Sequence, residues 1–77
     1  MSRLRKSFGK RLREVRLSRG LTQEQLAEKL EVSLNFLNLI ERGHRAPSFD
    51  TLERIARVLR TPVAEFFLVK LTGSPSA

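Results

Sequence analysis

Two capped helices separated by only two residues are the feature that most limits how this chain can fold. Thr22 starts the first of them as an N-cap, and Gln25, three residues on, completes the pattern of a capping box. Ser33 caps the next helix, so only Glu31 and Val32 remain for the connection. Helices joined this tightly cannot lie antiparallel and must cross steeply, which is the geometry of a helix-turn-helix unit.

The unit predicted for residues 22–42 has an inward face of apolar residues. These recur at helical spacing in both helices, as Leu26, Ala27 and Leu30 and then as Leu37 and Ile40. In such a unit the N-terminal end of the second helix faces solvent and can enter the major groove of DNA. The N-terminus of the first helix points its amides at a phosphate.

Glycine and proline mark further helix boundaries. A first helix is expected over about residues 7–19, before Gly20. Its apolar stripe consists of Phe8, Leu12, Val15 and Leu17. Gly43 ends the third helix, and residues 44–47 form a polar loop because Pro47 disfavours helix at the residue before it.

Two more helices are predicted after this loop. Ser48 caps the fourth, whose core face is formed by Leu52, Ile55, Ala56 and Leu59. Thr61 followed by Pro62 repeats the start signal and predicts a short fifth helix as far as Leu71. The tail, residues 72–77, is expected to be disordered. Since no segment alternates with period two over a useful length, the predicted fold is all-α, one compact five-helix domain.

A length of 77 residues allows a single domain over residues 1–77, and 40% hydrophobic content is enough for one small core. No apolar run approaches the ~20 residues that a transmembrane helix requires. The basic start MSRLRKSFGKR lacks the apolar stretch and the cleavage site of a signal peptide. Cysteine is absent, so disulfides and thiolate metal sites are excluded. These observations favour a cytoplasmic protein with no membrane partner.

The charge balance favours a polyanionic partner. Fifteen Lys and Arg against eight Asp and Glu give a net charge of +7 and a pI near 11.4. Nucleic acid is the first candidate partner and an anionic membrane surface the second. Residues 1–19 hold eight of the fifteen basic residues and a single acid, Glu14. A basic face kept for solubility would give the same count, so charge alone does not decide the function.

One long segment, GLTQEQLAEKLEVSLNFLNLIERGHRAPSFDTLERIARVL, resembles the lambda repressor/Cro-type helix-turn-helix proteins, the Xre family. The residues at the key positions of that motif are Gln23, Ala27, Val32, Leu37 and Ile40, and the sequence ERG at 41–43 closes it. The resemblance covers about residues 8–68. It implies a regulator of transcription that binds double-stranded DNA, usually as a symmetric dimer on a palindromic operator. In its size and its apolar fifth helix, the chain also resembles restriction–modification controller proteins and small phage repressors.

The resemblance implies DNA-contacting roles for three groups of residues. At the start of the unit, Gln23 is expected to hydrogen-bond a phosphate and to brace the recognition helix, with a backbone contact near Thr22. The exposed side of the recognition helix, about 33–42, is where this family reads bases, and it carries Ser33, Leu34, Asn35, Asn38 and Leu39. The loop along the sugar-phosphate backbone contributes His44, Arg45 and Ser48.

Asn35 is the favoured base reader, because its amide donates and accepts together and matches the N6/N7 edge of adenine. The alternative for Asn35 and Asn38 is a polar surface role. Leu34 and Leu39 depart from the polar or basic residues that are frequent at such positions in the family. They predict contacts with thymine methyl groups, or else a helix rotated by some degrees or a partner-binding surface.

Two structural expectations also follow from the family match. Arg16 and Glu41 match a pair that forms a partly buried salt bridge between the first and third helices and orients the recognition helix. Glu31 occupies a turn position that is commonly glycine, so a positive φ there would cost on the order of 1 kcal/mol.

The C-terminal helix is more apolar than its own domain needs. Val63 and Phe66, with one neighbour, are expected to complete the core. The remaining apolar surface suits an isologous dimer, for which the candidate interface residues are Phe66, Phe67, Leu68 and Leu71.

Other function classes find less support in the residues. With one His, no Cys and no Tyr, there is little catalytic material, no metal site and no sign of a cofactor. A protein-interaction module on the same fold, such as an antitoxin or a coactivator domain, is the main alternative, because fold alone does not settle function. A membrane-surface role for the basic first helix is disfavoured, since its apolar residues are needed in the core.

Overall fold

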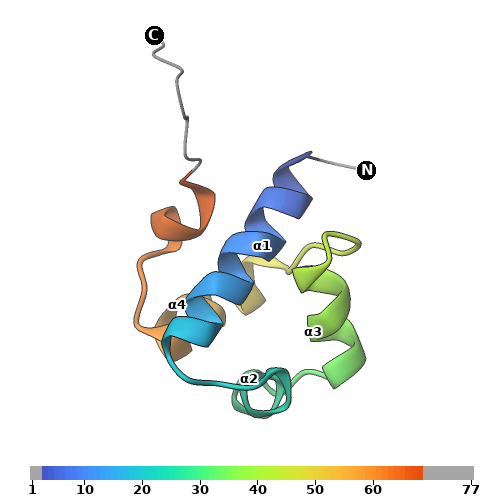
Figure 1. Ribbon diagram of the computed structural model, residues 1–77, viewed down its shortest axis with the longest axis vertical. Coiled ribbons are helices and arrows are strands. Elements are labelled where there is room, and N and C mark those ends of the chain that lie inside the picture. Colours follow the sequence, from blue (N-terminus) through green and yellow to red (C-terminus); the bar gives the residue numbers. More distant parts are fainter. Residues whose placement is uncertain (1–2, 69–77) are drawn as a thin grey trace, which may run out of the picture.

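The computed structural model describes residues 3–68, which form four α-helices and one 3-10 helix (Figure 1). In chain order the elements are α1 (Arg3–Ser18), α2 (Gln23–Leu30), α3 (Leu34–Glu41), α4 (Phe49–Leu59) and η1 (Val63–Phe67). No strand occurs in this part of the chain, and the all-α prediction is confirmed. The fifth element is a 3-10 helix rather than an α-helix. The helix end predicted at Leu71 and the disordered tail at 72–77 lie outside the described residues.

Helices α2, α3 and α4 begin where the N-cap residues predict. The Thr22 hydroxyl accepts a hydrogen bond from the Gln25 amide at 3.0 Å, and the Thr22 amide donates to Gln25 Oε1 at 2.9 Å, which completes the capping box. The hydroxyls of Ser33 and Ser48 each accept from the backbone amide three residues further on, at 2.9 and 3.1 Å. These caps satisfy amides that have no partner inside the helix.

Two boundary predictions are wrong. Helix α1 starts at Arg3 instead of residue 7, because residues 3–6 are good helix formers and Lys6 lies against Gly43 at the end of α3. Thr61 does not cap η1, since the cap position is Pro62 without a side-chain bond. Its hydroxyl instead donates to the Leu59 carbonyl at 2.9 Å.

One hydrophobic core joins all five elements. Its buried members are Phe8, Leu12, Val15, Leu26, Ala27, Leu30, Leu37, Ile40, Leu52, Ile55, Leu59 and Phe66. Two expected core residues are exposed: Leu17 lies on the outer side of α1, and Val63 is the first residue of η1. Phe66 is the fully buried residue at this end of the core, with its ring tilted against that of Phe8 at a centroid distance of 5.8 Å. A short 3-10 helix has too few turns to bury Val63 as well.

Helix α1 lies in the middle of the molecule, with α3 on one side and η1 on the other (Figure 1). It meets α3 at Gly9, where an added Cβ would come 2.6 Å from the carbonyl oxygen of Glu41. The absence of a side chain therefore lets the two helices approach closely. Within residues 3–68, no helix is both long and apolar enough to cross a membrane.

Candidate nucleic-acid interface

The turn between α2 and α3 places the two helices of the unit at a steep angle. Glu31, the residue after α2, adopts φ 60° and ψ 41°, the left-handed conformation. Its amide bonds the carbonyl of Glu28, and the amide of Val32 bonds that of Ala27 at 3.0 Å. The chain thus changes direction sharply at Glu31 and Val32, and α3 begins at Leu34.

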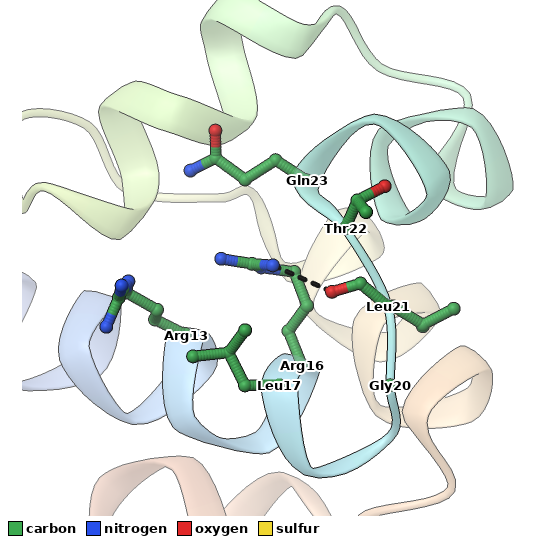
Figure 2. A pocket seen from close by; sticks show the side chains of 7 residues that line it. All are labelled: Arg13, Arg16, Leu17, Gly20, Leu21, Thr22 and Gln23. Carbon is green, nitrogen blue, oxygen red and sulfur yellow. Dashed lines mark hydrogen bonds between the residues drawn. The ribbon is translucent and has the colours of Figure 1, made fainter.

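A buried ion pair holds α3 against α1. The guanidinium of Arg16 donates to both carboxylate oxygens of Glu41, from Nε at 2.7 Å and from Nη2 at 3.1 Å. The side chains are only 6% and 2% exposed. The third guanidinium nitrogen, Nη1, donates to the Leu21 carbonyl at 2.7 Å, just before α2 (Figure 2). One side chain of α1 therefore fixes both helices of the unit, in a bidentate geometry that sets the direction of the carboxylate.

Gln23 extends this network to the outer side of α3. Its Nε2 donates to Glu41 Oε1 at 3.0 Å, while its Oε1 accepts from Asn38 Nδ2 at 3.4 Å. The half-buried Gln23 amide thus links the start of α2 to two successive turns of α3. Gln23 therefore contacts α3 directly, which is the contact that the expected bracing role requires.

The outer side of α3 is divided between exposed and half-buried residues. Asn35 is exposed, and Leu34 is 42% exposed beside it. Ser33 is also exposed, with its hydroxyl held by the cap. Asn38 and Leu39 are half-buried, so the solvent exposure of this side of α3 decreases after its first turn. The freest polar group at the N-terminal end of α3 is therefore the Asn35 amide.

The loop after α3 exposes all three residues assigned to it. His44, Arg45 and Ser48 are accessible to solvent. The guanidinium of Arg45 lies 5.3 Å from the centre of the Phe36 ring, a cation–π contact that orients it. The Ser48 hydroxyl accepts from the Thr51 amide and donates to Thr51 Oγ1, so its own bonding capacity is partly used.

A shallow hollow of about 620 Å³ opens beside the start of α2 (Figure 2). Arg13, Arg16 and Leu17 of α1 line one side, and Thr22 and Gln23 line the other. Arg13 was not among the sequence-predicted site residues. The available signal was its spacing, because Arg13 precedes Arg16 by three residues and therefore shares its side of the helix.

Comparisons with known proteins agree with this geometry. A helix-turn-helix family model, HTH_3, matches residues 12–66. The chain belongs to this helix-turn-helix family, of the lambda repressor/Cro (Xre) type. It is 44% identical over 52 residues to the HTH-type transcriptional regulator ImmR of Bacillus subtilis, a match that covers 68% of this chain and 41% of ImmR.

Two further similar proteins match a larger part of the chain. The immunity repressor protein of Bacillus phage phi105 is 45% identical over 58 residues, which are 75% of this chain and 40% of that repressor. The crystal structure of the restriction-modification controller protein C.AhdI from Aeromonas hydrophila aligns with a TM-score of 0.76 at 35% identity, over 80% of this chain and 94% of that one. The chain thus spans less than half the length of ImmR and of the phage repressor.

At the C-terminal end of the described residues, one candidate for the dimer interface, Phe66, is wrong. Phe66 is 0% exposed and belongs to the core, so its side chain is not available to a partner. Phe67 and Leu68 are exposed, and Phe67 also packs on Phe8 at 5.3 Å. Leu71 lies outside the described residues. Glu65 bonds Arg11 through both its carbonyl, at 3.1 Å, and its carboxylate, at 3.3 Å, and this fixes η1 to α1.

Proposed function

We propose that the chain is a sequence-specific regulator of transcription that places the helix at residues 33–42 in the major groove of double-stranded DNA. The observation that carries the proposal is the exposed Asn35 amide at the start of a helix whose direction is set by the buried Arg16–Glu41 pair. A rigid support is what a base-reading side chain needs, because misplacement by an ångström loses a bidentate contact. The relatives are regulators rather than enzymes, in accord with the expected non-enzymatic role.

Phosphate contacts would come from both sides of α3. On one side, the first-turn amides of α2 and the Gln23 side chain would contact the sugar-phosphate backbone of the DNA. Arg13, which lines the hollow at the same place, would add a positive charge. On the other side, the loop offers His44, Arg45 and Ser48. Arg45 is the strongest of these three, because its stacking on the ring of Phe36 limits the freedom it loses on binding.

Base contacts would centre on the first turn of α3. Asn35 pairs with adenine through N6 and N7, and the exposed Leu34 contacts a thymine methyl group. Asn38 is held by Gln23 in the free protein, so it reads a base only by exchanging that bond. Leu39 is half-buried, so only the exposed part of its side chain could make an apolar contact with a base.

A homodimer on a palindromic operator would use the exposed residues of η1. Val63 and Phe67 of η1 and Leu68 just after it are exposed apolar residues. The Arg11–Glu65 contacts fix η1 to α1. Two copies related by a two-fold axis would present their recognition helices about 34 Å apart, one turn of DNA. The site of action would be the cytoplasm, where a bacterial or phage regulator meets its DNA.

The first test is binding to random duplex DNA at several salt concentrations. Phosphate contacts predict that log affinity falls linearly with log salt, with a slope of about −0.9 for each contact. No binding at low salt would contradict the DNA proposal. It would favour a protein-interaction module, for which the exposed Leu34 is the supporting observation.

The second test concerns base reading by Asn35. Selection from a random DNA library with the wild type and with Asn35→Ala should give different preferred sites, with a loss at one adenine of about 1–3 kcal/mol in discrimination. Glu53→Ala, on the exposed side of α4, is the control and should select the wild-type site. The assignment fails if Asn35→Ala selects the wild-type site as well.

A further inference from the structure

A row of cations runs along one side of α1, outside the core and outside the helix-turn-helix unit. It consists of Arg3, Lys6, Lys10 and Arg13, separated by three, four and three residues. Such spacing places side chains on one side of a helix. The side of α1 that carries Phe8 and Leu12 is buried, so the row lies on the remaining surface.

The N-terminal part of this row borders a cleft of about 570 Å³ between α1 and the end of α3. Its lining residues are Arg3, Lys6, Ser7, Lys10, Glu41 and Arg42. The single acid among them, Glu41, is already paired with Arg16 and bonded by Gln23. It therefore does not neutralise the cations of the cleft, which presents four positive charges.

The row is continuous with the proposed DNA-binding side at both ends. Arg42 follows Asn38 by four residues and Asn35 by seven at the end of α3, so the cleft adjoins the base-reading stripe. At the other end, Arg13 lines the hollow with the start of α2. The row of cations is about 15 Å long between Arg3 and Arg13, at ~1.5 Å a residue. Phosphates on one DNA strand are spaced by about 3.4 Å along the axis, so the row is long enough to face more than one of them.

We propose that Arg3, Lys6 and Lys10, together with Arg42, form an additional surface for the phosphates of duplex DNA, beside the bases that α3 reads. The inference rests on the proposed function and extends its contact area to α1. Lysine and arginine are the usual donors to phosphate oxygens. A membrane surface fits this side less well, because three of the apolar residues of α1, Phe8, Leu12 and Val15, are buried in the core and only Leu4 and Leu17 are left exposed.

The test is the salt dependence of binding by Lys6→Gln/Lys10→Gln on random duplex DNA. Glutamine keeps the aliphatic stem that Lys6 lays against Gly43, so the fold should be retained, as checked by circular dichroism and melting. Loss of two phosphate contacts should make the slope of log affinity against log salt shallower by about 1.8. Lys29→Gln/Arg57→Gln removes the same charge from exposed positions on α2 and α4 and should leave the slope close to the wild-type value.

The outcomes separate this surface from the proposed function. If the wild type itself shows no salt-dependent binding to DNA, both proposals are wrong. If the wild type binds steeply but Lys6→Gln/Lys10→Gln keeps the wild-type slope, only the surface on α1 is wrong. The same conclusion follows if the control pair loses as much slope, because net charge alone would then explain the effect. A phosphate-binding role further requires that Lys6→Gln/Lys10→Gln selects the wild-type DNA site.

Discussion

Glu31 and Arg60 have backbone conformations that side chains seldom adopt. Their φ angles are 60° and 51°, and each directly follows a helix, α2 and α4 respectively. Glycine is the usual residue in this left-handed region, because a Cβ there crowds the backbone. The sequence comparison with the Xre family predicted the strained position at Glu31. Arg60 gave no such signal, because its conformation depends on how η1 is joined to α4.

Replacing Glu31 by glycine should stabilise the domain. Removal of the Cβ relieves the left-handed strain and should raise the free energy of unfolding by about 0.5–1 kcal/mol, or roughly 2–8 °C in melting temperature. Urea and thermal unfolding measure this. Lys29→Gly, two residues earlier within α2, is the control and should destabilise by about 1 kcal/mol. An unchanged or lower melting temperature for Glu31→Gly would contradict the backbone conformation.

At the scale of the elements, the crossing of α1 and α3 decides where α3, the proposed recognition helix, lies. Gly9 permits the close approach of α1 and α3, and the Arg16–Glu41 pair sets the orientation of α3. The first is a steric condition and the second an electrostatic one. Together they make α3 a rigid part of the domain rather than a helix attached only through its turn.

Gly9→Ala should destabilise the domain although alanine is the better helix former. Helix propensity alone would favour alanine by about 1 kcal/mol, whereas its Cβ would meet the carbonyl oxygens of Ile40 and Glu41. Overpacking against backbone typically costs about 1–3 kcal/mol, so we expect a net loss in urea unfolding. Stabilisation by Gly9→Ala would show that α1 and α3 are further apart than described.

The Arg16–Glu41 pair should show strong coupling in a double-mutant cycle. Arg16→Met or Glu41→Gln alone leaves a buried group without its partner and should cost up to about 3–5 kcal/mol of unfolding free energy. The double variant should lose clearly less than the sum of the two, because no unpaired charge remains. Strictly additive losses would mean that the two side chains do not interact.

At the scale of the whole molecule, α1 separates two surfaces of different character. On one side lie α3 and the basic hollow and cleft, which suit a polyanion. On the other side lies η1 with its exposed apolar residues (Figure 1). Because the surfaces are on opposite sides of one helix, the proposed partner chain at η1 would not cover α3 of the same chain.

Charged residues on η1 should therefore abolish dimerisation while the fold is retained. Val63→Asp/Leu68→Asp places two acids in the exposed apolar surface, away from the Phe66 ring that fills the core. Sedimentation equilibrium should show a dimer for the wild type and a monomer for this variant. Phe49→Asp is the matched control, since Phe49 is 85% exposed at the start of α4, and it should remain dimeric. A monomeric wild type would contradict the proposal that η1 forms a dimer interface.

Local signals in the sequence determined most of the helices. N-cap hydroxyls at Thr22, Ser33 and Ser48 act within three residues of themselves, so their effect can be read from the chain alone. The same holds for Gly20 and Gly43, which have φ angles of 73° and 82° after α1 and α3. Helical spacing likewise identified the residues of the core, because an amphipathic helix buries one side.

Apart from the Arg16–Glu41 pair, which the family resemblance implied, only the tertiary structure decided which groups meet across the fold. Arg19 donates to the Leu59 carbonyl at the end of α4, and Arg54 to the Leu30 carbonyl at the end of α2. Arg19 follows the end of α1 and Arg54 lies within α4, and neither has a spacing that predicts a distant partner. Phe66 is expected both in the core and among the interface candidates, and the structure confirms only its place in the core. How deeply a short terminal element sits depends on the helix beneath it. Contacts between residues far apart in sequence depend on packing in three dimensions, which periodicity does not encode.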